Sequence, residues 1–190
     1  MKITSFFRIS LIWGLMAAPA LSVAQQSGDR PGLTLGLHLN ETGQHYGLGL
    51  NASTPSFARG NLALRASGTM QYYEVPATTE SAMEWSRFAQ VRLGLVSYAP
   101  VCACGIRAYG ETGPLAIRPH TSFSNGNWQM GWYGLFGAEF LMSSSSLFFF
   151  EMGGQGASNK NAGIPAGYQS FGNGFMASAG FRLQFGSASN

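Results

Sequence analysis

Apolar residues alternate with small or polar residues along this chain, and the alternation is most regular over residues 174–185. One face of that segment carries Phe175, Ala177, Ala179, Phe181, Leu183 and Phe185. The other face carries Met176, Ser178, Gly180, Arg182 and Gln184. Successive side chains of a β-strand point to opposite faces, so a period of two predicts a strand and argues against a helix.

The same alternation recurs in seven earlier segments that are separated by turn residues. The eight segments are 33–39, 46–50, 62–73, 88–95, 106–112, 128–140, 148–155 and 174–185. Longer loops are expected at 75–85, 119–127 and 157–173, whereas the turn at 40–44 is short. No repeat of 20–50 residues and no linker divides the chain. We therefore predict an all-β protein whose single domain, residues 25–190, is an eight-stranded antiparallel barrel.

Composition predicts which face of the barrel is apolar. Charged residues make up 10% of the chain, against about 25% in soluble domains. The second face of most segments carries Gly, Ser, Thr and Gln, where a soluble barrel would carry Lys and Glu. Aromatic residues gather near segment ends, as an interfacial girdle requires: Tyr46, Tyr72, Trp85, Tyr98, Trp128, Phe140, Phe175 and Phe185. These features favour a transmembrane barrel with its apolar face toward lipid. A soluble periplasmic barrel of the lipocalin kind shows the same alternation and is the alternative.

The N-terminus has the pattern of a secretory signal peptide. Lys2 and Arg8 precede an apolar run, and Ser22-Val23-Ala24 supplies small residues before Gln25. We predict that residues 1–24 are removed and that the chain crosses the periplasm to the cell outer membrane. Without Lys2 and Arg8, nine basic residues face eight acidic ones. Because they form no basic cluster, nucleic acid is excluded as a partner.

The closing strand with its terminal aromatic residue resembles that of small eight-stranded outer-membrane barrels, the OmpA transmembrane domain and OmpX type. The resemblance implies that Phe181, Leu183 and Phe185 act as the membrane insertion signal. It also implies contact with the barrel-assembly machinery, outer-membrane lipids and lipopolysaccharide. Barrels of this type are associated with surface adhesion and defence, and OmpW-type barrels with apolar solutes. The function expected is a structural or surface-interaction role.

Seven charged residues are predicted to face the lumen of the barrel: Arg65, Arg92, Arg107, Glu111, Glu139, Glu151 and Arg182. Six of them are expected in one layer near the periplasmic end, with Glu111 higher. Neighbouring strands would pair Arg107 with Glu139, and Glu151 with Arg182, while Arg65 and Arg92 face the carboxylates across the lumen. Buried charges need partners, so a closed, salt-bridged lumen is predicted. A porin-like channel for small solutes, protons or ions is the alternative.

An enzyme that acts on lipid A is a further alternative. One outer-membrane deacylase type carries His-x-Ser-Asn, and this chain has His120-Thr121-Ser122 followed by Phe123 in place of Asn. No glutamate is expected on the outer side to orient His120. A palmitoyltransferase type uses an Asp at the outer rim, whereas Asp29 is the only Asp here. We therefore assign no catalytic residue, and His120 and Ser122 are the candidates under this alternative.

The outer loops could bind a partner through the aromatic side chains of Trp85, Phe123, Tyr168 and Phe171. Cys102 and Cys104 lie in a predicted periplasmic turn, either as a disulfide or as two free thiols.

His38 and His45 flank the first turn without a third ligand nearby in the sequence. No metal and no cofactor is therefore expected.

Overall fold

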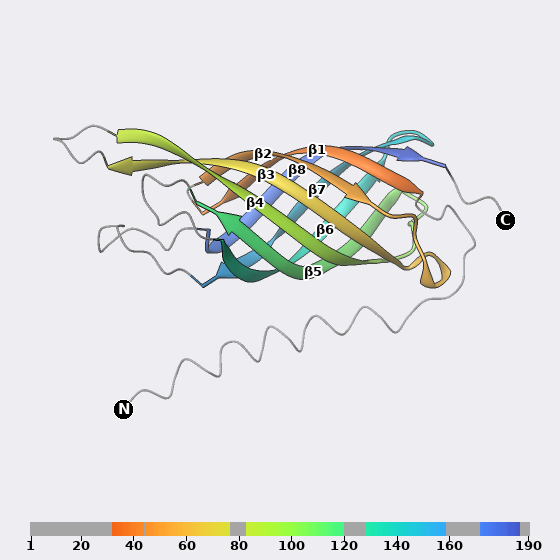
Figure 1. Cartoon of the computed structure of the whole chain (residues 1–190). Helices are drawn as coiled ribbons and strands as arrows, with labels where there is room; N and C mark the ends of the chain where they lie inside the picture. The colour runs from red at the N-terminus through yellow and green to blue at the C-terminus, as the bar shows by residue number, and fades with distance from the viewer. Residues whose placement is uncertain (1–31, 44, 77–82, 120–127, 159–171, 187–190) are drawn as a thin grey trace, which may run out of the picture.

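A closed antiparallel barrel of eight strands forms the molecule (Figure 1). The structure, a computed structural model, describes residues 32–43, 45–76, 83–119, 128–158 and 172–186. The strands are β1 Leu33–Thr42, β2 His45–Ser53, β3 Leu62–Pro76, β4 Met83–Tyr98, β5 Ile106–Arg118, β6 Gln129–Leu141, β7 Ser146–Ala157 and β8 Gly174–Phe185. A short 3-10 helix, η2 (Ala58–Gly60), follows β2. Each strand pairs with the next, and β8 pairs with β1. The predicted fold class is confirmed.

Two ends of the barrel can be told apart by their connections. The end where β1 begins and β8 ends, on the right in Figure 1, also carries the β2–β3, β4–β5 and β6–β7 connections. We name it the inner end. The opposite, outer end carries the other four connections, and there β3 and β4 project beyond the other strands (Figure 1). No helix of the described residues is long and apolar enough to span a membrane.

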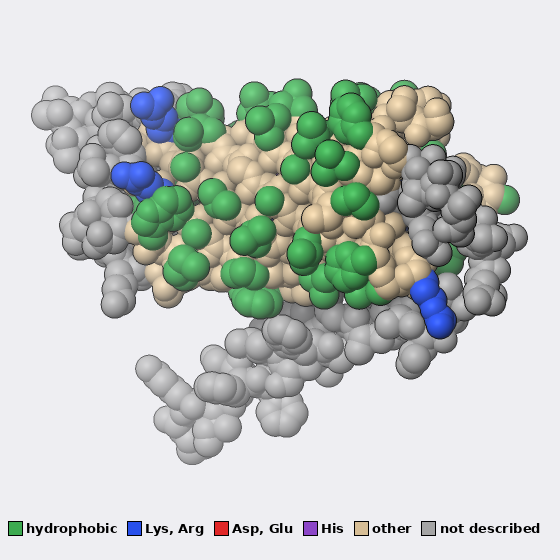
Figure 2. Space-filling model, turned by 45° about the vertical axis from the view of Figure 1, so that its right-hand side comes forward, with side chains coloured by type: hydrophobic (Ala, Val, Ile, Leu, Met, Phe, Trp, Pro, Cys, Tyr) green, Lys and Arg blue, Asp and Glu red, His purple; other side chains and the backbone are tan. Residues whose placement is uncertain are grey.

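Side chains are distributed inside out relative to a soluble domain. Leucine, methionine and aromatic side chains cover the outer wall in a broad band (Figure 2). The interior holds arginine, glutamate, glutamine and histidine side chains, all buried. Soluble proteins rarely bury so many charged groups. The distribution follows from the period-two pattern once the barrel closes, because most strands turn their more apolar face outward. β5 is the exception, since its Leu115 and Ile117 are buried inside.

Most strands are longer than the sequence pattern predicted, and the excess is largest for β4 and β5. β5 continues to Arg118, six residues past the predicted segment, even though it contains Pro114. Pro114 lacks an N–H group, and no β4 partner is recorded at that point, while pairing with Trp132 of β6 continues. β4 begins at Met83, so Trp85 lies in a strand paired with Glu74 and not in the predicted outer loop.

The inner-end turn between β4 and β5 contains a disulfide between Cys102 and Cys104. The backbone N–H of Cys102 donates to the carbonyl of Ile106 at 2.9 Å, and that of Gly105 donates to the carbonyl of Cys102 at 3.0 Å. Gly105 has a φ of 75°, a conformation that glycine adopts without steric cost. Of the two states that the sequence left open, the structure has the disulfide.

Candidate functional site in the barrel lumen

Six charged side chains meet inside the barrel and form what we call the charge network. They come from five strands: Arg65 on β3, Arg107 and Glu111 on β5, Glu139 on β6, Glu151 on β7 and Arg182 on β8. Each alternates with outward-facing neighbours, so its position on the inner wall is fixed locally by the strand. All six are buried.

Arg65 connects opposite walls of the barrel. Its Nη1 atom lies 2.7 Å from Oε2 of Glu111 and 3.2 Å from Oε1 of Glu151, and its Nη2 atom lies 3.6 Å from Oε1 of Glu139. In a ring of eight strands, β3 and β7 are diametrically opposed. The Arg65–Glu151 ion pair therefore crosses the full width of the lumen.

The two remaining arginines of the network bind the same carboxylates. Arg182 places Nη1 2.7 Å from Oε1 of Glu139 and Nη2 2.5 Å from Oε1 of Glu151. Arg107 donates from Nε, at 2.9 Å, and from Nη2, at 2.5 Å, to Oε2 of Glu139. Glu139 thus contacts three guanidinium groups, and the neighbouring-strand pairs expected from the sequence are both in contact.

Tyrosine hydroxyls complete the coordination of the carboxylates, and the sequence analysis did not identify them. Tyr109 donates to Glu151 at 2.5 Å, and Tyr133 donates to Glu111 at 2.6 Å. The hydroxyl of Tyr98 accepts from Nη2 of Arg65 at 3.1 Å. Tyr98 was predicted to belong to the outer aromatic girdle, and this is wrong, because it is buried in the lumen. The sequence did contain the signal for this inward position, because Tyr98 is an even number of residues from Phe88 and Arg92 and therefore lies on the same face of the strand.

Arg92 is buried in the lumen but does not join the network. The β3–β4 register pairs Arg65 with Gly94 and Ser67 with Arg92, so Arg92 lies two residues nearer the outer end. Its Nη1 atom donates to the Met176 sulfur at 3.5 Å, and its guanidinium lies 5.3 Å from the Tyr133 ring centroid. Among the described residues its Nε atom has no hydrogen-bond partner, and no carboxylate forms a salt bridge with it.

The structure therefore changes the predicted membership of the charge layer at two positions. Arg92 lies on the inner wall, as predicted, but it forms no salt bridge with a carboxylate of the described residues, and Glu111, predicted above the layer, belongs to it through Arg65. The β4–β5 register explains both differences. It places Glu111 opposite Val96, which lies nearer the inner end of the barrel than Arg92 does.

Nearer the outer end, an uncharged chain of side chains crosses the lumen a second time. Nε2 of Gln71 donates to Oδ1 of Asn40 at 2.8 Å and to Oε1 of Gln90 at 3.0 Å. Nε2 of Gln90 donates to Oε1 of Gln155 on β7 at 2.8 Å. We name Asn40, Gln71, Gln90 and Gln155 the amide chain. Side chains thus bridge the lumen at two levels.

The two histidines that flank the first turn are also buried on the inner wall. His38 lies between Nδ2 of Asn51, 3.2 Å from its Nδ1, and Oγ1 of Thr69, 3.3 Å from its Nε2. The ring of His45 packs edge-on against Phe88, with centroids 5.5 Å apart. Within the described part of the chain, no three His, Cys, Asp or Glu side chains are grouped to hold a metal ion.

The remaining predicted site residues fall into two groups. Phe181, Leu183 and Phe185 point outward from β8 and are exposed. His120, Ser122, Phe123, Tyr168 and Phe171 lie outside the described residues.

Two solved barrels share this fold. The N-terminal β-barrel domain of OprF from Pseudomonas aeruginosa superposes with a TM-score of 0.56 at 12% identity, covering 83% of this chain and all of that one. The outer membrane protein OprG from the same organism gives a TM-score of 0.54 at 12% identity, covering 86% of this chain and all of that one. No protein-family model matches the sequence, and the comparison with curated proteins finds no match.

Proposed function

We propose that this protein is an outer-membrane β-barrel with a closed lumen, in which the charge network fixes the barrel and the outer loops remain available for partners. Its role is structural or in surface interaction. The observation that carries the proposal is the Arg65–Glu151 ion pair, which joins opposite walls of the barrel. An eight-stranded barrel is only wide enough for side chains to fill it. The amide chain occupies a second level of the same lumen.

Opening such a lumen would require separation of buried charges. Glu139 contacts three arginines, and Arg65 contacts three carboxylates, so no single rotation frees one group without leaving another unpaired. Breaking a buried pair typically costs about 3–5 kcal/mol. A network of six ion pairs therefore favours a permanent plug over a gate that opens at thermal energies.

The height of the apolar band supports insertion into a bilayer. On β4 the outward positions between Arg87 and Ser97 are Ala89, Val91, Leu93 and Leu95. Ten residues of strand span about 33 Å, and a strand tilt of about 40° reduces this to about 25 Å along the barrel axis. That height equals the apolar band of outer-membrane barrels. The shared fold with OprF and OprG agrees with it.

Planar-bilayer recording tests the closed lumen. We expect no large, stable conductance from the purified, folded protein, because the charge network and the amide chain both cross the lumen. A steady, ohmic conductance in every insertion would contradict the plug and would favour the small-solute channel. Parallel fractionation of Gram-negative cells tests the location. The protein is expected in the outer membrane, with Gln25 as its first residue.

Mass spectrometry of lipid A separates this proposal from the enzyme alternative. Cells that express the protein are expected to keep an unchanged lipid A spectrum. Loss of an acyl chain that Ser122→Ala abolishes would replace the proposal with a deacylase.

A further inference from the structure

A row of polar-tipped side chains runs around the outer wall at the outer end. Strand pairing places Tyr46 of β2 opposite Tyr72 of β3, and Tyr72 opposite Arg87 of β4. The next strand contributes Arg118 from the end of β5, and Trp128 lies beside it just before β6. All five side chains are exposed, and we name them the outer row.

The two arginines of the outer row are near neighbours. Ala89 pairs with Arg118, and Arg87 lies on the same face of β4, two residues nearer the outer end. Such diagonal neighbours have Cα atoms about 7–8 Å apart, which long side chains easily span. The guanidinium of Arg118 also lies 5.9 Å from the ring centroid of Trp128. Figure 2 shows two arginine side chains near each other at the outer end.

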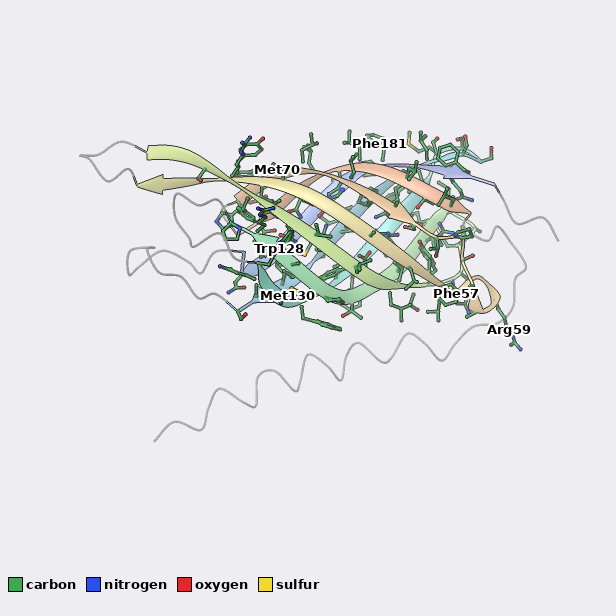
Figure 3. The ribbon with its side chains drawn as sticks, viewed as in Figure 1. Phe57, Arg59, Met70, Trp128, Met130 and Phe181 are labelled. Atoms are coloured by element: carbon green, nitrogen blue, oxygen red, sulfur yellow. A yellow bond between two sulfur atoms is a disulfide. The ribbon has the colours of Figure 1, made fainter. Side chains whose placement is uncertain are left out.

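Among the described side chains, no salt bridge neutralises Arg87 or Arg118. The other exposed arginine among the described residues lies far away. Arg59 is at the inner end, beside Phe57 (Figure 3). Glu41 is also exposed at the outer end, but it lies on β1, three strands from Arg87. At about 4.8 Å per strand this is roughly 14 Å, beyond the reach of an ion pair. Among the described side chains the rim is therefore positive on its β4–β5 side, and the side chains of Glu74 and Glu84 at the same end lie outside that set.

In the proposed membrane location, the outer row also lies at the level of a lipid headgroup. Arg87 marks the outer edge of the apolar band on β4, with Met70, Ala89 and Met130 on the bilayer side of the row. Tyrosine and tryptophan favour this interfacial depth. The outer end also carries the two longest connections, 119–128 and 158–173, as the extracellular end of such barrels does.

We propose that Arg87 and Arg118 bind a phosphate group of lipid A in the outer leaflet, with Trp128 packed against the sugar that carries it. A guanidinium matches phosphate oxygens with two parallel N–H donors, so two neighbouring guanidiniums suit one phosphate. This inference rests on the proposed outer-membrane function and adds the residues that would hold the lipid.

Native mass spectrometry of the folded barrel tests the site. The protein is placed in phosphatidylcholine nanodiscs with diphosphoryl lipid A, its dephosphorylated form or phosphatidylglycerol as the probe. We expect retention of diphosphoryl lipid A and about tenfold weaker retention by Arg87→Gln and by Arg118→Gln. Arg59→Gln is the matched control, because it removes an exposed arginine at the inner end, and it should retain lipid A like the unchanged protein.

Each result separates the site from the membrane proposal. Equal retention by all four proteins, or an equal loss with Arg59→Gln, would overturn the site while the barrel remains a membrane protein. Competition by phosphatidylglycerol as strong as by lipid A would overturn the assignment to lipid A. Heat-dependent electrophoretic mobility, measured first, reports the folded barrel. A chain that fails to fold in bilayers would overturn both proposals.

Discussion

Two buried arginines on adjacent strands show how much the environment of a single residue decides. Arg65 is 1% exposed and Arg92 is 2% exposed, so both guanidinium groups have lost almost all their water. Arg65 regains three carboxylates and two hydroxyl oxygens. Arg92 gains a sulfur contact and the face of Tyr133. The same residue type at equal burial is therefore expected to have opposite effects on stability.

Arg65→Met is expected to destabilise the folded barrel by about 3–5 kcal/mol. The substitution leaves Glu111 without its arginine and removes the link across the lumen. Urea-induced unfolding in lipid vesicles, followed by tryptophan fluorescence, measures the change. Arg59→Met at the exposed inner turn is the control and should change stability by less than about 0.5 kcal/mol. Equal losses in the two variants would show that the network adds nothing to stability.

Arg92→Met is expected to leave stability within about 1 kcal/mol of the unchanged protein, or to raise it. A buried guanidinium without a carboxylate carries a desolvation cost that a flexible apolar side chain of similar length avoids. The same urea titration gives the comparison with Arg65→Met. A loss as large as that of Arg65→Met would reveal a strong partner for Arg92 outside the described residues.

At the scale of the element, the barrel closes where β1 meets β8, and the closure depends on an inward glycine. Gly180 lies directly opposite His38 in the β1–β8 register. A Cβ atom on Gly180 would lie 2.7 Å from the Cα atom of His38, and it would also overlap the carbonyl oxygen of Leu37. These are backbone atoms, which cannot rotate away. The seam is thus closed by backbone contact at a position where no larger residue fits.

Gly180→Ala is therefore expected to destabilise the barrel by about 1–3 kcal/mol, because the two strands must move apart. Gly68→Ala is the matched control, since a Cβ atom there would have no neighbour within 4 Å. The control should be neutral or stabilising by up to about 1 kcal/mol. Thermal unfolding on a mobility-shift gel ranks the variants. A Gly68→Ala protein that melts as early as Gly180→Ala would contradict the steric explanation.

At the scale of the whole molecule, the barrel is polar inside and apolar outside. Leu93 is 58% exposed near the middle of the outward face of β4. A lipid environment gives the apolar outer wall a favourable solvent, whereas water would not. Exposed large apolar side chains lie on every strand except β5, so this is a property of most of the barrel wall.

Leu93→Arg distinguishes the two solvents. In a bilayer the substitution should cost about 2–4 kcal/mol, because the charge lies near the midplane. In a soluble barrel the same exposed position would tolerate arginine with little change. Leu33→Arg, at the inner edge of the band, is the control and should cost about 0–1 kcal/mol in the bilayer. Equal and negligible effects in vesicles would contradict a lipid-facing wall.

The local alternation of the sequence determined the eight strands and the inner or outer face of most of their residues. This succeeded because a strand has a period of two whatever surrounds it, so Arg107 and Glu139 were found on the inner wall without knowledge of the fold. Strand ends were less certain, since pairing with β6 carries β5 past Pro114. Alternation also predicts the inward position of Tyr98, but Tyr98 was assigned to the aromatic girdle because it lies at a strand end.

Only the closed barrel decided which charges meet. Whether Arg65 or Arg92 reaches the carboxylates depends on the stagger between strands and on strand tilt, which accumulate around the ring until β8 meets β1. A shift of two residues on one strand keeps every side chain on the same face, so the sequence pattern is blind to it. The same shift moves a guanidinium by about 6.6 Å, enough to make or break an ion pair. The sequence alone therefore determined which residues face the lumen, and the tertiary structure decided how they are paired across it.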